Sequence, residues 1–189
     1  MVIRVLGIGE AVMEIGSGLC TLAFSFSDRA NSFVSVEIAA DVVDFLNENY
    51  AFGYGNLKIV PADFLQYKDE RRFDIFLSTD TLEHISDVDG FVRKSCYFLK
   101  EHGKAIIVFP NILSHGIRHY YKGRELIQLF QDSGYSDVCV FNVRPASYVK
   151  WIYRSFLFTR KTLEKRAYTE LRKHIYQSEK QHTCSGTTA

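Results

Sequence analysis

The stretch Val12-Met13-Glu14-Ile15-Gly16-Ser17-Gly18 is an apolar run that ends in two glycines separated by one residue. Glycine has no Cβ, so a strand that ends in this way can turn tightly and bring its backbone close to a ligand. A second apolar run, 33–36, ends in Glu37, nineteen residues after Gly18. An acidic side chain at the end of a second strand can accept hydrogen bonds from both hydroxyls of a ribose. The two runs therefore predict a nucleoside site at one edge of a sheet.

Short apolar runs alternate with longer helical patterns along the chain, which predicts a Rossmann-like, doubly wound α/β fold. We expect a mostly parallel sheet with helices on both faces and an antiparallel edge strand near the C-terminus, with 155–159 as its candidate. The expected strands are 11–15, 33–37, 57–60, 73–78, 104–109 and 137–143, and the expected helices are 18–27, 39–50, 87–100 and 123–133.

The composition is that of a soluble intracellular protein. The chain has 189 residues, of which 47% are hydrophobic, and this is enough to bury one core without disulfides. Its four cysteines are scattered and form no CxxC pair, which indicates a reducing compartment and argues against a zinc site. We see neither a secretion signal nor an apolar run long enough to span a membrane, so we expect a cytoplasmic location.

Charge divides the chain near Pro145. Residues 1–143 carry a net charge of −6, whereas residues 144–189 carry +7. We expect a catalytic core over 1–143, a basic and aromatic-rich extension over 144–180, and a frayed tail over 181–189. The extension is consistent with a final sheet element and a solvated helix, with peripheral contact to an anionic membrane, or with binding of phosphates. The acidic core argues against extended nucleic-acid binding.

The order of the motifs resembles the class I S-adenosylmethionine-dependent methyltransferases. Residues 14–20, Glu-Ile-Gly-Ser-Gly-Leu-Cys, are similar to the first motif of that superfamily, with Cys20 where a third glycine is common. Residues 73–78 and the following Asp80-Thr81-Leu82-Glu83-His84-Ile85 are similar to its fourth strand and the loop after it. An NAD-binding module is the weaker interpretation, because Thr21 stands where the dinucleotide fingerprint requires glycine.

The resemblance implies S-adenosylmethionine as the cofactor and assigns residues to it. Glu37 would bind the ribose, Asp63 would accept from the adenine amine, and Phe64 would lie beside the adenine, with core packing as its alternative. Glu14 would organise the loop or a water near the methionine amino group, and Ser78 would border the methionine half. The expected cofactor-binding residues are Glu14, Gly16, Ser17, Gly18, Glu37, Asp63, Phe64 and Ser78.

Candidates for the catalytic base lie after the fourth and fifth strands. They are His84, His115 and His119, with Asp80 beside the acceptor. Asp80, Glu83 and His84 also form a D-x-x-E-H cluster like one that has been associated with a metal in the ubiquinone-biosynthesis O-methyltransferases, although we expect no metal here.

The acceptor class follows only from an absent motif. Amino-methylating members often carry Asn/Asp-Pro-Pro-Tyr after the fourth strand, where this chain reads Ser-Thr-Asp-Thr over 78–81. We therefore expect O-methylation of a small molecule or of a glycan or lipid precursor. The short segment before the first strand leaves open a second copy or a partner chain that covers the site. A non-catalytic methyltransferase-like subunit that binds or activates a partner is the alternative.

Overall fold

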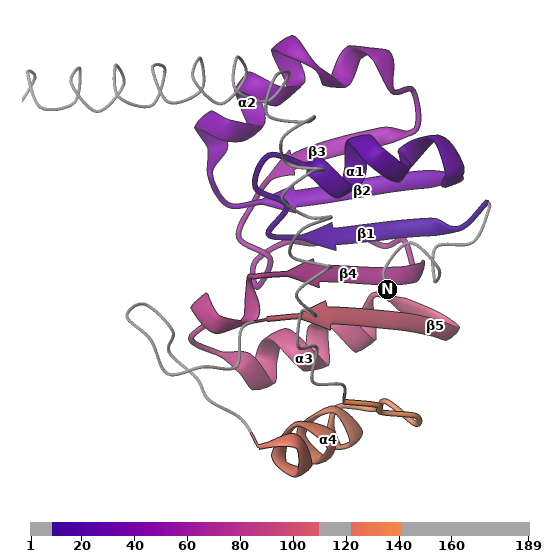
Figure 1. Ribbon diagram of the computed structural model, residues 1–189, viewed down its shortest axis with the longest axis vertical. Helices are drawn as coiled ribbons and strands as arrows, with labels where there is room; N and C mark the ends of the chain where they lie inside the picture. The colour runs from indigo at the N-terminus through magenta and orange to yellow at the C-terminus, as the bar shows by residue number, and fades with distance from the viewer. Residues whose placement is uncertain (1–8, 110–121, 141–189) are drawn as a thin grey trace, which may run out of the picture. The chain divides into compact units, whose positions relative to one another are not determined.

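A five-stranded parallel sheet is the centre of the computed structural model, which describes residues 9–109 and 122–140. The strand order is β3-β2-β1-β4-β5, and Figure 1 shows the strands one above another in this order. The strands are β1 Ala11–Ile15, β2 Ser32–Glu37, β3 Leu57–Pro61, β4 Phe73–Thr79 and β5 Leu99–Val108. The contacts group the described residues into one unit that ends at Val140.

The order of the strands reverses between β1 and β4. The chain moves outward from β1 to β2 and β3 and then returns to pair β4 with the other side of β1. In open parallel sheets, ligands bind beyond the carboxyl ends of the strands at such a reversal. Here Ile15 pairs with Val36 of β2 and with Ser78 of β4, so the ends of these three strands meet at one edge.

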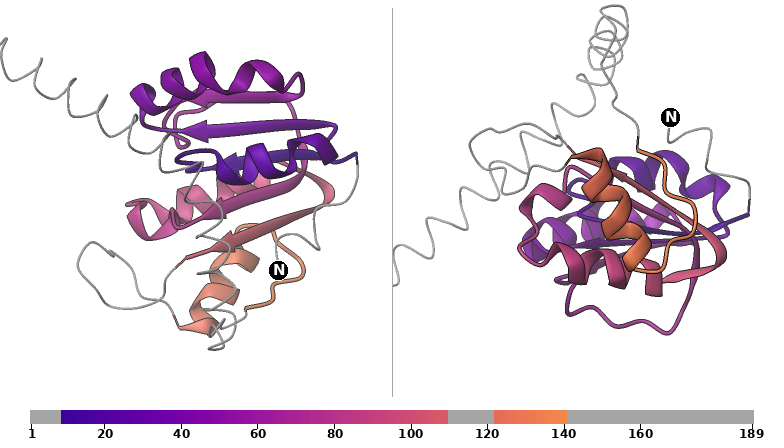
Figure 2. Two further views of the ribbon diagram at one scale, coloured as in Figure 1. Left: turned by 45° about the horizontal axis from the view of Figure 1, so that its top comes forward. Right: turned by 90° about the horizontal axis from the view of Figure 1, so that it is seen from below.

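Helices cover both faces of the sheet, as the sequence predicts (Figure 2). Buried residues of α1 (Thr21–Phe26) and α2 (Ala40–Asn49) pack with one face, and those of α3 (Val88–Tyr97) pack with the other. The helix α4 (Gly123–Asp132) lies against α3 and brings Leu129 and Phe130 to the second face. Short 3-10 turns, η2 (Ser27–Arg29), η3 (Ala51–Gly53) and η4 (Leu82–His84), complete the described elements.

Most predicted elements are confirmed within one to three residues, with two corrections. The fifth strand begins at Leu99 rather than 104, because Leu99 already pairs with Phe73 of β4; residues 100–103 are then extra residues of β5 in a register shift, and the regular pairing starts at Lys104 opposite Ile75. The predicted strand 137–143 is wrong over its described part, since 137–140 has no regular structure and Val140 is 45% exposed. The candidate edge strand 155–159, the extension 144–180 and the tail 181–189 lie outside the described residues.

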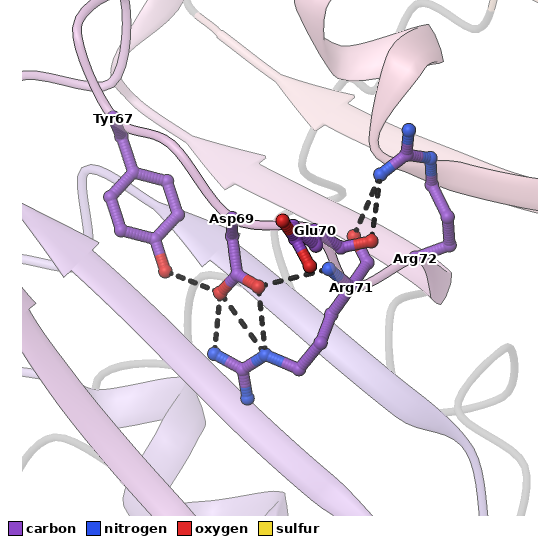
Figure 3. A network of polar contacts seen from close by, with 5 residues as sticks. All are labelled: Tyr67, Asp69, Glu70, Arg71 and Arg72. Atoms are coloured by element: carbon purple, nitrogen blue, oxygen red, sulfur yellow. Dashed lines mark hydrogen bonds and ion pairs between the residues drawn. The ribbon is translucent and has the colours of Figure 1, made fainter.

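A polar network closes the connection between β3 and β4 (Figure 3). Asp69 accepts hydrogen bonds from the Tyr67 hydroxyl at 2.7 Å and from Arg71 Nε at 2.9 Å, and it forms an ion pair with Arg71. The hydrogen bonds from Arg71 hold the pKa of Asp69 well below its usual range. The Cζ atom of Arg72 lies 3.8 Å from the centroid of the Tyr97 ring. This cation–π contact joins the connection to the end of α3.

Among the helices that the structure describes, none is both long enough and apolar enough to cross a bilayer.

Candidate functional site at the carboxyl edge of the sheet

The loop after β1 turns back over the sheet through two glycines. Gly16 has a φ of 68° and Gly18 a φ of 51°, values that a residue with a Cβ adopts only with strain. The Gly16 N–H donates to Val36 O at 2.9 Å, which fixes the start of the loop to β2. A Cβ on Gly16 would overlap the Thr81 side chain, whereas a Cβ on Gly18 would point into open space. Position 16 therefore requires glycine both for its φ and because a side chain would overlap Thr81. Gly18 exposes its backbone at the edge of the sheet.

Glu37, the predicted ribose acid, lies directly against this loop. Its side chain accepts a hydrogen bond from the Gly18 N–H at 2.7 Å and another from the Ala39 N–H at 3.1 Å, one on each carboxylate oxygen. A carboxylate has about four acceptor sites, so each oxygen keeps a lone pair for a further donor. The next residue, Ile38, is 70% exposed although it is apolar. Sequence reasoning missed Ile38, and its only signal was an apolar side chain directly after the strand-ending acid.

Glu14 lies beneath the loop rather than at its surface. Its side chain is 2% exposed and accepts a hydrogen bond from Ser35 Oγ at 2.8 Å. The pKa of Glu14 is raised to about 7, chiefly by burial. The Glu37 charge also raises it, and the hydrogen bond from Ser35 opposes the shift. Glu14 is therefore held by β2, and its role in organising the loop stays a prediction.

The residues after β3 separate into one exposed and one buried side chain. Asp63 is exposed, and its Oδ1 accepts from the Leu65 N–H at 2.9 Å, which caps a short turn. Phe64 is a correction to the predicted set. Its ring is 4% exposed and packs at 5.1 Å from the Phe91 ring and 5.6 Å from the Phe76 ring, so it belongs to the core and is not presented to a ligand.

The segment after β4 carries polar groups in different surroundings. Ser78 is fully buried, and its Oγ has no hydrogen-bond partner within the described residues. Asp80 is exposed with a φ of 52°, and its N–H donates to Val108 O at 2.8 Å. His84 is 63% exposed, with Nε2 at 3.9 Å from Oε1 of Glu83, a carboxylate that is only 4% exposed.

The D-x-x-E-H cluster does not form a three-ligand set. Over residues 9–109 and 122–140, no group of three His, Cys, Asp or Glu side chains gathers closely enough to hold a metal ion. Glu83 instead faces inward with Oε2 unpartnered among the described residues, beside the exposed imidazole of His84. The other predicted bases, His115 and His119, lie outside the described residues.

Comparison with protein families shows to which family the chain belongs. The sequence model of a methyltransferase domain matches residues 7–178, which is most of the chain. The chain belongs to the methyltransferase domain family. S-adenosylmethionine is the cofactor of this family, as predicted, and the edge fits a nucleoside on its own geometry: a carboxylate with free lone pairs, bare loop backbone at Gly18 and an exposed apolar Ile38 lie together.

Curated relatives resemble the methyltransferase domain only in part. A ubiquinone biosynthesis O-methyltransferase of Coxiella burnetii is 22% identical over 144 residues, which covers 76% of this chain and 61% of the relative. The (S)-coclaurine N-methyltransferase of Papaver somniferum is 24% identical over 119 residues, covering 60% and 32% of the two chains. The chain thus spans less than two thirds of the length of these relatives.

Solved structures confirm the fold of the methyltransferase domain. The YcgJ protein of Bacillus subtilis aligns with a TM-score of 0.63 at 21% identity, covering 81% of this chain and 74% of that one. A putative methyltransferase of Bacillus halodurans aligns with a TM-score of 0.60 at 16% identity, covering 70% and 66%. The [4+2]-cyclase SpnF aligns with a TM-score of 0.57 at 18% identity, covering 69% and 52%, so the fold also occurs in a protein named for a different reaction.

Proposed function

We propose that this chain is an S-adenosylmethionine-dependent methyltransferase that methylates a hydroxyl oxygen of a small molecule or of a glycan or lipid precursor. The single observation that carries the proposal is the contact between Glu37 and Gly18. It sets an anionic hydrogen-bond acceptor beside open loop backbone at the carboxyl edge of β1 and β2. Membership of the methyltransferase domain family supports S-adenosylmethionine as the ligand of this edge.

Four groups would hold the cofactor. Glu37 would accept from the ribose hydroxyls with the lone pairs that Gly18 and Ala39 leave free, and the backbone of Gly16 and Gly18 would approach without side-chain obstruction. Ile38 would cover the apolar face of the adenine, and the exposed Asp63 carboxylate would accept from its amine. When bound, S-adenosylmethionine supplies an electrophilic methyl group on its sulfonium.

The base would be His84, which lies beside Glu83. The Glu83 carboxylate is 3.9 Å from Nε2, and the exposed imidazole would accept the proton of an acceptor hydroxyl. Because Asp80 is exposed after the same strand, it would orient the acceptor from the side. His115 and His119 remain alternative bases of the proposal.

The choice of an oxygen acceptor has support from two directions. The chain has no Asn/Asp-Pro-Pro-Tyr after β4, and one of its curated relatives is named as an O-methyltransferase of ubiquinone biosynthesis. The coclaurine relative is named as an N-methyltransferase, so an amine acceptor is the outcome to test against. A second copy or a partner chain covering the acceptor side stays part of the proposal.

Titration calorimetry with S-adenosylhomocysteine tests the cofactor assignment directly. We expect binding to the wild-type chain, a loss of about ten-fold or more in Glu37→Ala, and unchanged affinity in Glu48→Ala, which removes an exposed glutamate of α2. Equal affinity of the Glu37→Ala variant and the wild type would remove the ribose assignment. A folded chain that binds neither S-adenosylmethionine nor S-adenosylhomocysteine would favour the non-catalytic, partner-activating subunit.

A further inference from the structure

Two strand residues on one face hold the glycine loop from below. Ser35 and Glu37 are alternate residues of β2 and therefore point to the same side of the sheet. Glu37 holds the loop through Gly18 N–H at 2.7 Å, as described above. Ser35 reaches the same loop by a second route, through side chains alone.

The second route is a chain of four side chains, of which those of Glu14, Ser35 and Cys20 are buried. Glu14 and Ser35 are register partners on β1 and β2, and Ser35 Oγ donates to Glu14 Oε2 at 2.8 Å. Cys20 Sγ lies 3.6 Å from Ser35 Oγ and 3.2 Å from Ser17 Oγ. Ser17 stands between the two loop glycines, so the chain runs from the sheet to the segment that would meet the cofactor.

Cys20 occupies a backbone position that costs it free energy. Its φ is 53°, in the region where glycine carries no penalty and other residues are strained. Its side chain is fully buried, and burial raises the pKa of the thiol to about 11, so the group stays protonated and can donate. A strained residue whose buried side chain bridges two hydroxyls points to a role for that side chain.

We propose that Ser35 and Cys20 are positioning residues that fix the Gly16–Gly18 loop in its cofactor-binding shape, acting through Glu14 below and Ser17 above. The inference rests on the proposed function only for its ligand. The four side chains act as a single connected unit, because each hydroxyl or thiol orients the next one. Removing any middle member leaves Glu14 and Ser17 without the link between them.

Calorimetry with S-adenosylhomocysteine on matched variants tests this chain of four side chains, Glu14, Ser35, Cys20 and Ser17, which we call the relay. We expect Ser35→Ala and Cys20→Ala each to weaken binding about five-fold, the usual scale for one lost hydrogen bond in a positioned group. Cys20→Ser keeps a donor and should stay within about two-fold of the wild type. Ser27→Ala is the control, since Ser27 is equally buried but its Oγ has no partner within the described residues.

The double variant Ser35→Ala/Cys20→Ala distinguishes a relay from two independent contacts. Members of one connected unit are not additive, so we expect the double variant to lose no more than the weaker-binding single variant. Independent and additive losses, or a Cys20→Ser variant as weak as Cys20→Ala, would overturn the proposal.

Hydrogen exchange provides a readout that needs no ligand. In the peptide that spans residues 14–22, Ser35→Ala should speed exchange of the loop amides, and Ser27→Ala should not. Unchanged exchange would overturn the relay even if the cofactor binds. Faster exchange in a chain that fails to bind S-adenosylhomocysteine would instead support the relay and overturn the proposed function.

Discussion

The Thr81 side chain fills the space in which a Cβ of Gly16 would lie. Thr81 Oγ1 also lies 3.3 Å from Ile15 O and 3.0 Å from Thr79 O and can donate to either carbonyl, so the turn after β4 contacts the end of β1. The two strands that flank the reversal in strand order are thus locked together at the edge where the site lies. Gly16 is required by a neighbour from a distant part of the sequence as well as by its own φ.

Substitution of the two loop glycines should therefore fail in different ways. Gly16→Ala should lower the free energy of unfolding by ~2–4 kcal/mol, from left-handed strain and from overlap with Thr81. Gly18→Ala should cost only ~1–2 kcal/mol, because its Cβ meets nothing, yet it should weaken S-adenosylhomocysteine binding at least ten-fold by filling open space at the edge. Urea unfolding and calorimetry separate the two effects. Partial recovery of Gly16→Ala by Thr81→Ala would confirm the overlap, and no recovery would contradict it.

Glu14 should give the stability an unusual dependence on pH. Because burial raises its pKa from 4.5 to about 7, the folded chain keeps a proton that the unfolded chain releases between these values. The contribution of Glu14 is complete below pH 4.5 and is lost as pH rises through about 7. Relative to Glu14→Gln, the wild type should lose ~1–3 kcal/mol of unfolding free energy over this window. Urea unfolding of both proteins from pH 4.5 to 7.5 measures the difference in unfolding free energy. A difference that does not change with pH would refute the raised pKa of Glu14.

The contribution of Asp69 to stability should depend on pH in the opposite direction. The Arg71 hydrogen bonds lower the pKa of Asp69, so its contribution is present above the unfolded pKa of about 4 and is lost as pH falls. Asp69→Ala should cost about 1 kcal/mol at pH 7, a modest value because Arg71 is 46% exposed, and the gap to the wild type should narrow toward pH 3. Asp89→Ala, on the exposed first turn of α3, is the matched control for urea unfolding. A gap that is constant with pH would exclude the ion pair as its cause.

His84 and His102 form a matched pair for the catalytic proposal. Each histidine lies just under 4 Å from the preceding glutamate, but only Glu83 is buried, whereas Glu101 is 91% exposed. His84→Ala should lower the rate of S-adenosylhomocysteine release with a hydroxyl-bearing acceptor by roughly 10²–10⁴-fold, and His102→Ala should leave it unchanged. The acceptor is first identified by screening hydroxyl-bearing small molecules and glycan and lipid precursors. Equal rates in the two variants would move the base to His115 or His119.

Local pattern was enough to predict the layers of the fold and the outline of the cofactor edge. The strands 11–15, 33–37 and 73–78 were predicted because continuous apolar runs bounded by glycine or acid behave alike in most parallel sheets. The predicted strand 137–143 failed over its described part because an apolar pattern does not say whether a neighbouring strand is available to pair.

Burial and partners were decided by the tertiary structure. The sequence by itself determined that Gly16, Gly18 and Glu37 stand at strand ends, since spacing along the chain fixes position within an element. It did not determine that Phe64 belongs to the core, that Thr81 packs on Gly16, or that Ser35 and Cys20 connect Glu14 to the loop. Those relationships join residues that are far apart in the sequence. They exist only when the parallel pairing of β1 with β2 and β4 brings the strand ends to one edge, and the local pattern predicts that edge but not which side chains meet there.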